Sequence, residues 1–327
     1  MTVKRVDENG TEIRATYTPT VTEVTPRSTN AVSSGLQGQQ QRGKPIFTPG
    51  DKAVPIDMAQ PMTFEDNQTT KKVDKVGTYV IESDGTITFT PDKQYVGTPS
   101  PVTVKRVDTN GTEVTATYTP TGTRVTPTST NAESTGLQGQ PQSGKPTFSP
   151  GDQQIPIDMS KSMTFENGMN TLEVANEGTY TINSDDTITF KPLKQFTGKA
   201  TPVTVKRVDT NGTEVTATYT PNVTKVTPTS TPATSSGPQG VPQTGTPVFK
   251  EGDPAVPIDY NKQMTFDDDQ PKKTVAGVGE YTINSDGSIT FTPDKQYVGT
   301  PAPVTVKRVD KNGTEVTATY TPTVTRV

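Results

Sequence analysis

The sequence predicts an all-β protein built from tandem β-sandwich-like domains of about seven short strands each. The chain repeats itself with a period of 101 residues, so one fold should recur along it. About one residue in five is Thr, which suits a pleated, half-buried surface, and the 30 Pro and 27 Gly residues punctuate short strands. Apolar and polar side chains alternate in short runs bounded by turn residues, which is typical of strands.

The repeat is clearest in the segment VTVKRVD-x-NGTEVTATYTP, which begins at Val102, Val203 and Val304. A diverged copy of this segment opens the chain. These positions divide the sequence into a partial C-terminal hairpin of a preceding repeat and three full repeats, at residues 1–24, 25–125, 126–226 and 227–327. We therefore expect the chain to be a piece of a longer array.

The opening of each repeat differs in composition from the rest. In repeat 1 it runs from Thr25 to Pro45, is rich in Ser, Thr, Gly, Gln and Pro, and contains few apolar residues. Such a segment buries too little apolar surface to offset the entropy lost on ordering. We predict that these stretches, each about 20 residues long, are polar linkers or loosely held arms.

The body of the repeat contains two strong hairpin signals. Tyr79 and Ile81 are spaced to face inward on a strand, a Ser-Asp-Gly turn follows, and Ile87 and Phe89 are spaced to face inward again. The second hairpin turns at the Asn-Gly pair of residues 110–111 and joins two strands marked by Val102, Val104, Val114, Ala116 and Tyr118. Shorter strands are expected around Phe47, Val54 to Ile56, and Met62 to Phe64.

The 20 aromatic residues follow the repeat closely. Only Tyr260 lies outside the pattern, since Tyr17 belongs to the leading partial copy. Aromatic side chains placed so regularly on strands indicate a core rather than a ligand platform. The six positions in repeat 1 are Phe47, Phe64, Tyr79, Phe89, Tyr95 and Tyr118.

Composition excludes most catalytic chemistry. The chain has no Cys, His or Trp, so it lacks a thiolate nucleophile, an imidazole base and soft zinc ligands. We predict no catalytic residue and no cofactor. A net charge of −4, from 31 basic and 35 acidic residues finely interspersed, argues against nucleic acid and membrane partners. The N-terminus lacks the apolar core of a signal peptide, so we expect an intracellular protein or an excised piece.

Two acidic segments carry side-chain oxygens of the type that bind cations. Asp108, Asn110 and Glu113 surround a Gly in a pattern that resembles the start of a calcium loop. A strand is predicted directly after that Gly, so we favour a hairpin turn over a metal site. The stretch Asp267 to Asp269 has equivalents shifted by one position, and a solvated loop explains it better.

Lysine residues suggest two further possibilities. Lys105-Arg106 and its copies could seat a phosphate or carboxylate, but beside Asp108 and opposite Glu113 we favour cross-strand charge pairs. A Lys–Asn amide cross-link would need a buried Lys, an Asn and an acidic group together. Asn110 lies one hairpin away from the first of the candidate lysines, but as a turn residue it is a poor partner; the lysines are Lys93, Lys194 and Lys295.

Three segments carry a family resemblance. They are the opening from Gly139 to Phe148, the central pattern GTYxIxSDGxITFxPxKQ, and the closing YVGTPxPVTVKRVDxNGTEVTATYTPTVT. In these segments the repeat resembles the CshA-type fibril repeat of Gram-positive, especially streptococcal, cell-surface adhesins. Repeat 2 departs most, for example with Asp186 in place of the turn Gly.

The resemblance implies extracellular, wall-anchored fibrils in which many repeats hold a ligand-binding region away from the cell. It brings no catalytic residues. The leading hypothesis is a structural stalk whose partners are neighbouring repeats, with host matrix or other bacterial cells met through the full-length adhesin. The alternative is that the repeats are multivalent adhesive modules that themselves bind host matrix protein or glycan.

Overall fold

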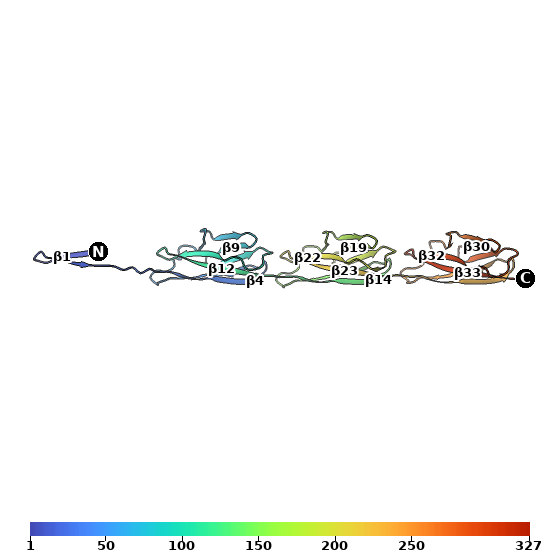
Figure 1. Cartoon of the computed structure of the whole chain (residues 1–327), viewed down its shortest axis with the longest axis horizontal. Helices are drawn as coiled ribbons and strands as arrows, with labels where there is room; N and C mark the ends of the chain where they lie inside the picture. The colour runs from blue at the N-terminus through green and yellow to red at the C-terminus, as the bar shows by residue number, and fades with distance from the viewer. The chain divides into compact units, whose positions relative to one another are not determined.

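The computed structural model describes residues 1–327 and contains strands but no helix (Figure 1), which confirms the all-β prediction. The leading segment holds β1 (Thr2–Val6) and β2 (Glu12–Thr16). Repeat 1 holds β3 (Arg27–Thr29), β4 (Ala31–Leu36), β5 (Gln41–Gly43), β6 (Ile46–Thr48), β7 (Thr63–Phe64), β8 (Thr70–Val73), β9 (Gly77–Ile81), β10 (Ile87–Pro91), β11 (Val102–Val107) and β12 (Glu113–Thr123).

Repeats 2 and 3 show the same order, and repeat 2 has one extra short strand, β21. Repeat 2 holds β13 (Thr128–Thr130), β14 (Ala132–Leu137), β15 (Gln142–Gly144), β16 (Thr147–Ser149), β17 (Thr164–Phe165), β18 (Thr171–Val174), β19 (Gly178–Ile182), β20 (Ile188–Pro192), β21 (Gly198–Lys199), β22 (Val203–Val208) and β23 (Glu214–Thr224). Repeat 3 holds β24 (Thr229–Thr231), β25 (Ala233–Pro238), β26 (Gln243–Gly245), β27 (Val248–Lys250), β28 (Thr265–Phe266), β29 (Lys272–Val275), β30 (Gly279–Ile283), β31 (Ile289–Pro293), β32 (Val304–Val309) and β33 (Glu315–Thr325).

By its internal contacts the chain forms two compact units. The first comprises Met1–Thr126 together with two short segments from further along, Gly151–Ile155 and Thr210–Thr213. The second unit contains the rest of repeat 2 and all of repeat 3, in the segments Pro127–Pro150, Pro156–Asp209 and Glu214–Val327.

Each repeat is a sandwich of two main sheets. In repeat 1 one sheet has the order β5-β10-β9-β8 and the other β4-β12-β11-β7, and β3 pairs with β6. Both predicted hairpins are present, as β9–β10 and as β11–β12. Strands also form at Phe47 and at Phe64, whereas residues 54–56 make only isolated bridges. Strand β8 adds to the predicted set.

The prediction of a polar linker or loosely held arm at the start of each repeat is wrong. In repeat 1 these residues form β4, which pairs in parallel with β12 from Ala31 to Leu36, and β5, which pairs with β10. A prediction based on apolar content overlooks these strands, because polar side chains in them are held by hydrogen bonds. Gln41 is only 5% exposed, and its Nε2 donates to the Thr121 carbonyl at 3.0 Å.

Aromatic rings from both sheets fill the core, as predicted. The Tyr79 and Phe89 rings of one sheet stack at 4.6 Å, and Tyr118 of the other sheet meets Tyr79 edge-on at 6.2 Å. All three rings are 0% exposed. Gly43 lies against Tyr118 so closely that an added Cβ would sit 2.3 Å from the ring. Tyr260, outside the repeat pattern, is 67% exposed.

The leading residues 1–24 form a separate hairpin of β1 and β2, with every strand residue exposed. Tyr17 is 65% exposed, whereas its equivalent Tyr118 is fully buried. The apolar face of this hairpin therefore has no sheet packed on it, in contrast to the same sequence in a full repeat.

The buried tyrosines give a matched test of the polar part of the core. Burial raises the pKa of both the Tyr79 and the Tyr118 hydroxyl, so both are protonated at neutral pH. The Tyr118 hydroxyl lies 2.7 Å from Ser33 Oγ, which donates to Gln41 Oε1, whereas the Tyr79 hydroxyl is buried without a partner.

We expect Tyr118→Phe to lower the unfolding free energy of repeat 1 by ~1 kcal/mol, because a satisfied hydrogen bond is lost. Tyr79→Phe removes an unsatisfied hydroxyl and should be neutral or stabilising. Urea denaturation of the two variants measures the difference. An equal loss in both would contradict the assigned network.

Candidate functional site

Each repeat carries a tight turn at the tip of its longest hairpin. In repeat 3 the turn runs from Asp310 to Gly313 and joins β32 to β33. The Asp310 carboxylate is buried, and its Oδ1 accepts backbone N–H bonds from Asn312 at 2.9 Å and from Thr314 at 2.8 Å. Gly313 has a φ of +85°, which glycine adopts without strain. The turn is therefore held in shape from within.

The equivalent turn of repeat 1, with Glu113 at the start of β12, carries the pattern that resembles the start of a calcium loop. Asp108 Oδ1 accepts N–H bonds from Asn110 at 2.9 Å and Thr112 at 2.8 Å. Glu113 pairs with Lys105 at 3.5 Å, which confirms a cross-strand charge pair. Asp108 Oδ1 and the Glu113 carboxylate thus serve the hairpin. No three His, Cys, Asp or Glu residues of the chain are grouped so that they could hold a metal ion.

A second structural feature lies beyond the far end of the long strand. In repeat 2, Gln138 follows β14 and is 3% exposed. Its backbone N–H donates to the carbonyl of Thr224 at 2.9 Å, its Oε1 accepts from the Val226 N–H at 3.2 Å, and its Nε2 donates to the Lys194 carbonyl at 2.9 Å. One side chain therefore ties the end of β23 to the loop after β20. Gly139 follows, with a φ of +75°.

Within the second unit, the turn of repeat 3 docks on this feature of repeat 2. Asn312 Nδ2 donates to the Gln138 carbonyl at 2.7 Å, and Gln195 Nε2 donates to the Asn312 carbonyl at 2.5 Å. Lys194 Nζ donates to the Lys311 carbonyl at 3.0 Å. We call residues 311–313 the tip, residues 138–139 with 194–195 the seat, and the two together the joint.

The fit at the joint is tight. A Cβ added to Gly139 would lie 2.0 Å from Asn312 Oδ1, so only glycine leaves room for the tip. Gly240 is the equivalent glycine in repeat 3, has nearly the same φ of +78°, and has no heavy atom within 4 Å of such a Cβ. Asn312 is 6% exposed, whereas the equivalent Asn110 is exposed. These differences follow from docking, because the local sequence is nearly the same.

The same bonds recur in the first unit, which includes Thr210–Thr213. There Asn211 Nδ2 donates to the Gln37 carbonyl at 2.8 Å, and Gln94 Nε2 donates to the Asn211 carbonyl at 2.6 Å. Lys93 Nζ donates to the Thr210 carbonyl at 3.1 Å. The joint is therefore a feature of the repeat and not of one pair of residues.

Two of the lysines that could form an amide cross-link, Lys93 and Lys194, lie in a joint, and Lys295 is the equivalent residue of repeat 3. Lys93, Lys194 and Lys295 are exposed, whereas the cross-link needs a buried lysine. The exposed lysines agree with the expectation from the sequence that a cross-link is disfavoured. Gln138 was missed altogether, because a buried Gln in a polar segment gives no periodic signal.

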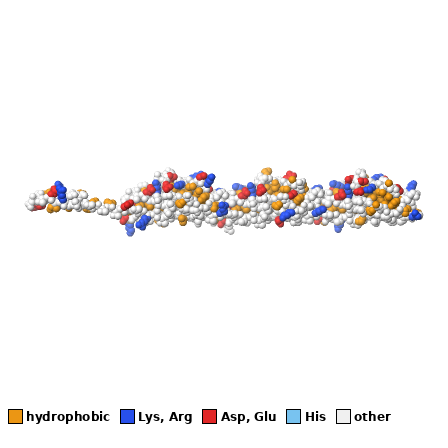
Figure 2. Space-filling model, in the orientation of Figure 1, with side chains coloured by type: hydrophobic (Ala, Val, Ile, Leu, Met, Phe, Trp, Pro, Cys, Tyr) orange, Lys and Arg blue, Asp and Glu red, His pale blue; other side chains and the backbone are white.

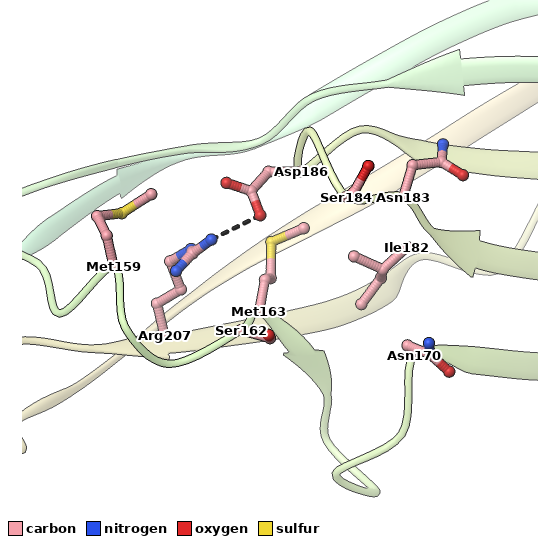
Figure 3. A pocket seen from close by; sticks show the side chains of 9 residues that line it. All are labelled: Met159, Ser162, Met163, Asn170, Ile182, Asn183, Ser184, Asp186 and Arg207. Carbon is pink, nitrogen blue, oxygen red and sulfur yellow. Dashed lines mark hydrogen bonds and ion pairs between the residues drawn. The ribbon is translucent and has the colours of Figure 1, made fainter.

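A hollow of about 370 Å³ in repeat 2 is lined by Arg207 and Asp186 among other residues, and none of the lining residues belongs to the tip or the seat (Figure 3). Arg207 and Asp186 point toward one another in it, with 2.6 Å between Nη2 and Oδ1. Arg207 also donates to the Lys161 carbonyl at 2.8 Å and is 7% exposed. The second residue of the basic pair thus makes structural bonds here, and Asp186 supplies a carboxylate where the other repeats have Gly.

Charges of both signs alternate over the face shown in Figure 2. In the acidic stretch of repeat 3, Asp267 pairs with Lys273, and Asp269 Oδ1 lies 2.7 Å from Lys307 Nζ. These exposed carboxylates are paired with lysines. No helix in the chain is long and apolar enough to cross a membrane.

Tandem β-sandwich repeats that dock through a recurring joint define the class of this chain, which is a repeat region. The family described as the surface adhesin CshA repetitive domain matches residues 23–122, 124–223 and 225–324, and the chain belongs to this family. It is therefore a repeat region of a surface adhesin, and the family indicates a place at the cell surface. None of the curated proteins matches the sequence.

Solved structures with tandem β domains are similar to the chain at low identity. They include the extracellular cadherin domains of protocadherin gamma B2 (10% identity, TM-score 0.39, covering 100% of this chain and 71% of that one). A mouse cadherin-23 fragment has 12% identity and a TM-score of 0.36, covering 93% of this chain and 100% of that one. A three-domain titin variant has 12% identity and a TM-score of 0.34, covering 94% and 100%.

The two glycines provide a test of the joint. We expect Gly139→Ala to release repeat 3 from repeat 2, and Gly240→Ala to leave them docked. Both variants place Ala at a positive φ, at a shared cost of about 1–2 kcal/mol, and only the first meets Asn312. Double electron–electron resonance measures the distance between spin labels on cysteines introduced at Lys191 in repeat 2 and Lys272 in repeat 3. Equal distance distributions in both variants would refute the joint.

Proposed function

We propose that the chain is part of the stalk of a wall-anchored bacterial surface adhesin and spaces a ligand-binding region away from the cell. This role is structural and not catalytic. The observation that carries it is the joint, because it connects one end of a repeat to the opposite end of the next.

The two docking parts of a repeat lie at the two ends of its longest strand. In repeat 3 the turn Asp310–Gly313 directly precedes β33. The seat residue Gln239 donates its N–H to the carbonyl of Thr325, at the far end of the same strand. β33 has 11 residues, which span roughly 35 Å in an extended strand. Each repeat therefore offers its tip at one end and its seat at the other.

Contacts of this head-to-tail kind use two different surfaces. A repeat that docks through its tip still has its seat free, so another repeat can dock there. Heterologous contacts that do not close into a ring generate open arrays. A repeat of this design suits a fibril whose length is set by the number of repeats.

The stalk hypothesis is tested by length. In X-ray scattering of arrays with increasing repeat number, the maximum dimension should grow by roughly 35 Å or somewhat more with each repeat. An adhesin shortened to very few repeats, displayed on cells, should keep its affinity in solution but capture fewer ligand-coated beads. A compact particle, or bead capture that is independent of repeat number, would contradict this function.

A second candidate is that a repeat itself binds glycan. The hollow of repeat 3, about 420 Å³, is lined by Tyr260, Asn261, Asn284 and Arg308 among others. The Arg308 guanidinium lies 4.9 Å from the centre of the exposed Tyr260 ring. An exposed tyrosine ring, with a guanidinium over it and the Asn261 amide and the Asn284 side-chain oxygen in the same hollow, has the chemistry to hold a sugar ring.

Tyr260→Met gives repeat 3 the residue that repeat 2 has at the equivalent position, Met159. If the hollow binds glycan, immobilised wild-type chain should retain glycans on an array and this variant should lose them, typically by about tenfold in affinity. Equal retention, or none by the wild type, would remove the second candidate.

A further inference from the structure

The side chain at the centre of the joint is also a chemically reactive amide. Asn312 is followed by Gly313, and the same Asn-Gly pair occurs at Asn9, Asn110, Asn167 and Asn211. An Asn before Gly loses its amide readily, because no side chain shields the backbone nitrogen that follows. That nitrogen attacks the Asn side-chain carbon, and the product is an aspartate or isoaspartate.

We propose that Asn312 is a deamidation site controlled by the joint: it is protected while the tip is docked, reacts when the joint opens, and then prevents redocking. In the step, the Gly313 nitrogen forms a bond to Asn312 Cγ and loses its proton. The Cγ–Nδ2 bond breaks and ammonia leaves. Water then opens the cyclic imide to a carboxylate, so atoms balance without a redox partner.

Docking blocks the first step. Asn312 Nδ2 is held by the Gln138 carbonyl at 2.7 Å and the residue is 6% exposed, so the side chain cannot turn toward the next nitrogen and water is excluded. Closing the imide ring requires this bond to break. Local opening is therefore needed before reaction, and the rate follows the fraction of open joint.

The turn itself does not explain a difference between repeats. Gly313 N donates to the Asp310 carbonyl at 2.9 Å, and Gly111 N donates to the Asp108 carbonyl at the same distance. The restraint on the attacking nitrogen is thus equal in the two turns. Asn110 is exposed and Asn312 is docked, so the joint alone separates them.

The product cannot restore the joint. A carboxylate has no N–H to donate, so two oxygens would face each other where Asn312 Nδ2 now meets the Gln138 carbonyl. Lys194 offers little compensation, because its ammonium is exposed and bonded to the Lys311 carbonyl. An isoaspartate also lengthens the backbone and moves the carbonyl that Gln195 binds. One chemical event therefore makes a reversible opening permanent.

The test is ageing of the full chain at mildly alkaline pH, followed by peptide mapping that detects conversion of each amide to an acid. We expect Asn312 to react at least about tenfold more slowly than Asn110, as for a joint open about a tenth of the time. Gly139→Ala should bring Asn312 close to the rate of Asn110, and Gly240→Ala should not. Equal rates at Asn312 and Asn110 in the wild type would overturn the proposal.

A second pair of variants tests the product without depending on Gly139→Ala. Asn312→Asp should broaden the label-to-label distance between repeats 2 and 3, and Asn110→Asp should leave it unchanged. A narrow distance in Asn312→Asp would show that the acid still docks and would overturn the claim of permanence. The proposal rests on the joint, which the stalk hypothesis shares, but scattering of arrays measures length and does not depend on deamidation.

Discussion

The rest of the repeat depends on its long C-terminal strand, β12 in repeat 1. This strand has 11 residues and pairs antiparallel with β11 along its first half and parallel with β4 along its second. One strand therefore ties the most recognisable hairpin of the sequence to the segment that looks least like structure. Its two ends also place the turn and the seat, so the same strand that builds the core sets the direction in which repeats connect.

The sequence predicts the hairpins well because apolar side chains define their faces. Alternation from Tyr79 to Phe89 specifies a buried face, and Asn110-Gly111 specifies the turn of the second hairpin. Strands β4 and β5 escape prediction for a physical reason. The hydrogen bonds between strand backbones need no apolar side chain. In these strands Ser33 and Gln41 make hydrogen bonds inside the repeat, but a hydrophobicity scale treats both residue types as exposed.

In the joint, too, the parts marked by residue type are predictable and the parts held by hydrogen bonds between distant residues are not. The tip residue Asn312 lies in a turn that the Asn-Gly pair predicts, and Lys194 is a charged residue two positions before the aromatic Phe196. What connects them is long-range: Gln138 acts through its backbone carbonyl, and any residue type carries that group. Among the seat residues, only Gly139 gives a signal in the sequence, because the tip needs the space that a side chain would fill.

A joint of a few polar bonds is weak, since each is worth ~1 kcal/mol after competition with water. Repeats 2 and 3 are covalently consecutive, however, so closing the joint is an intramolecular event with a high effective concentration. Weak bonds then suffice to dock the repeats most of the time and still allow them to part under load. The balance is also fragile, because exchanging the Asn312 donor for an acceptor removes one bond and adds a repulsion. A polar joint thus gains reversibility and becomes sensitive to a change of a single amide.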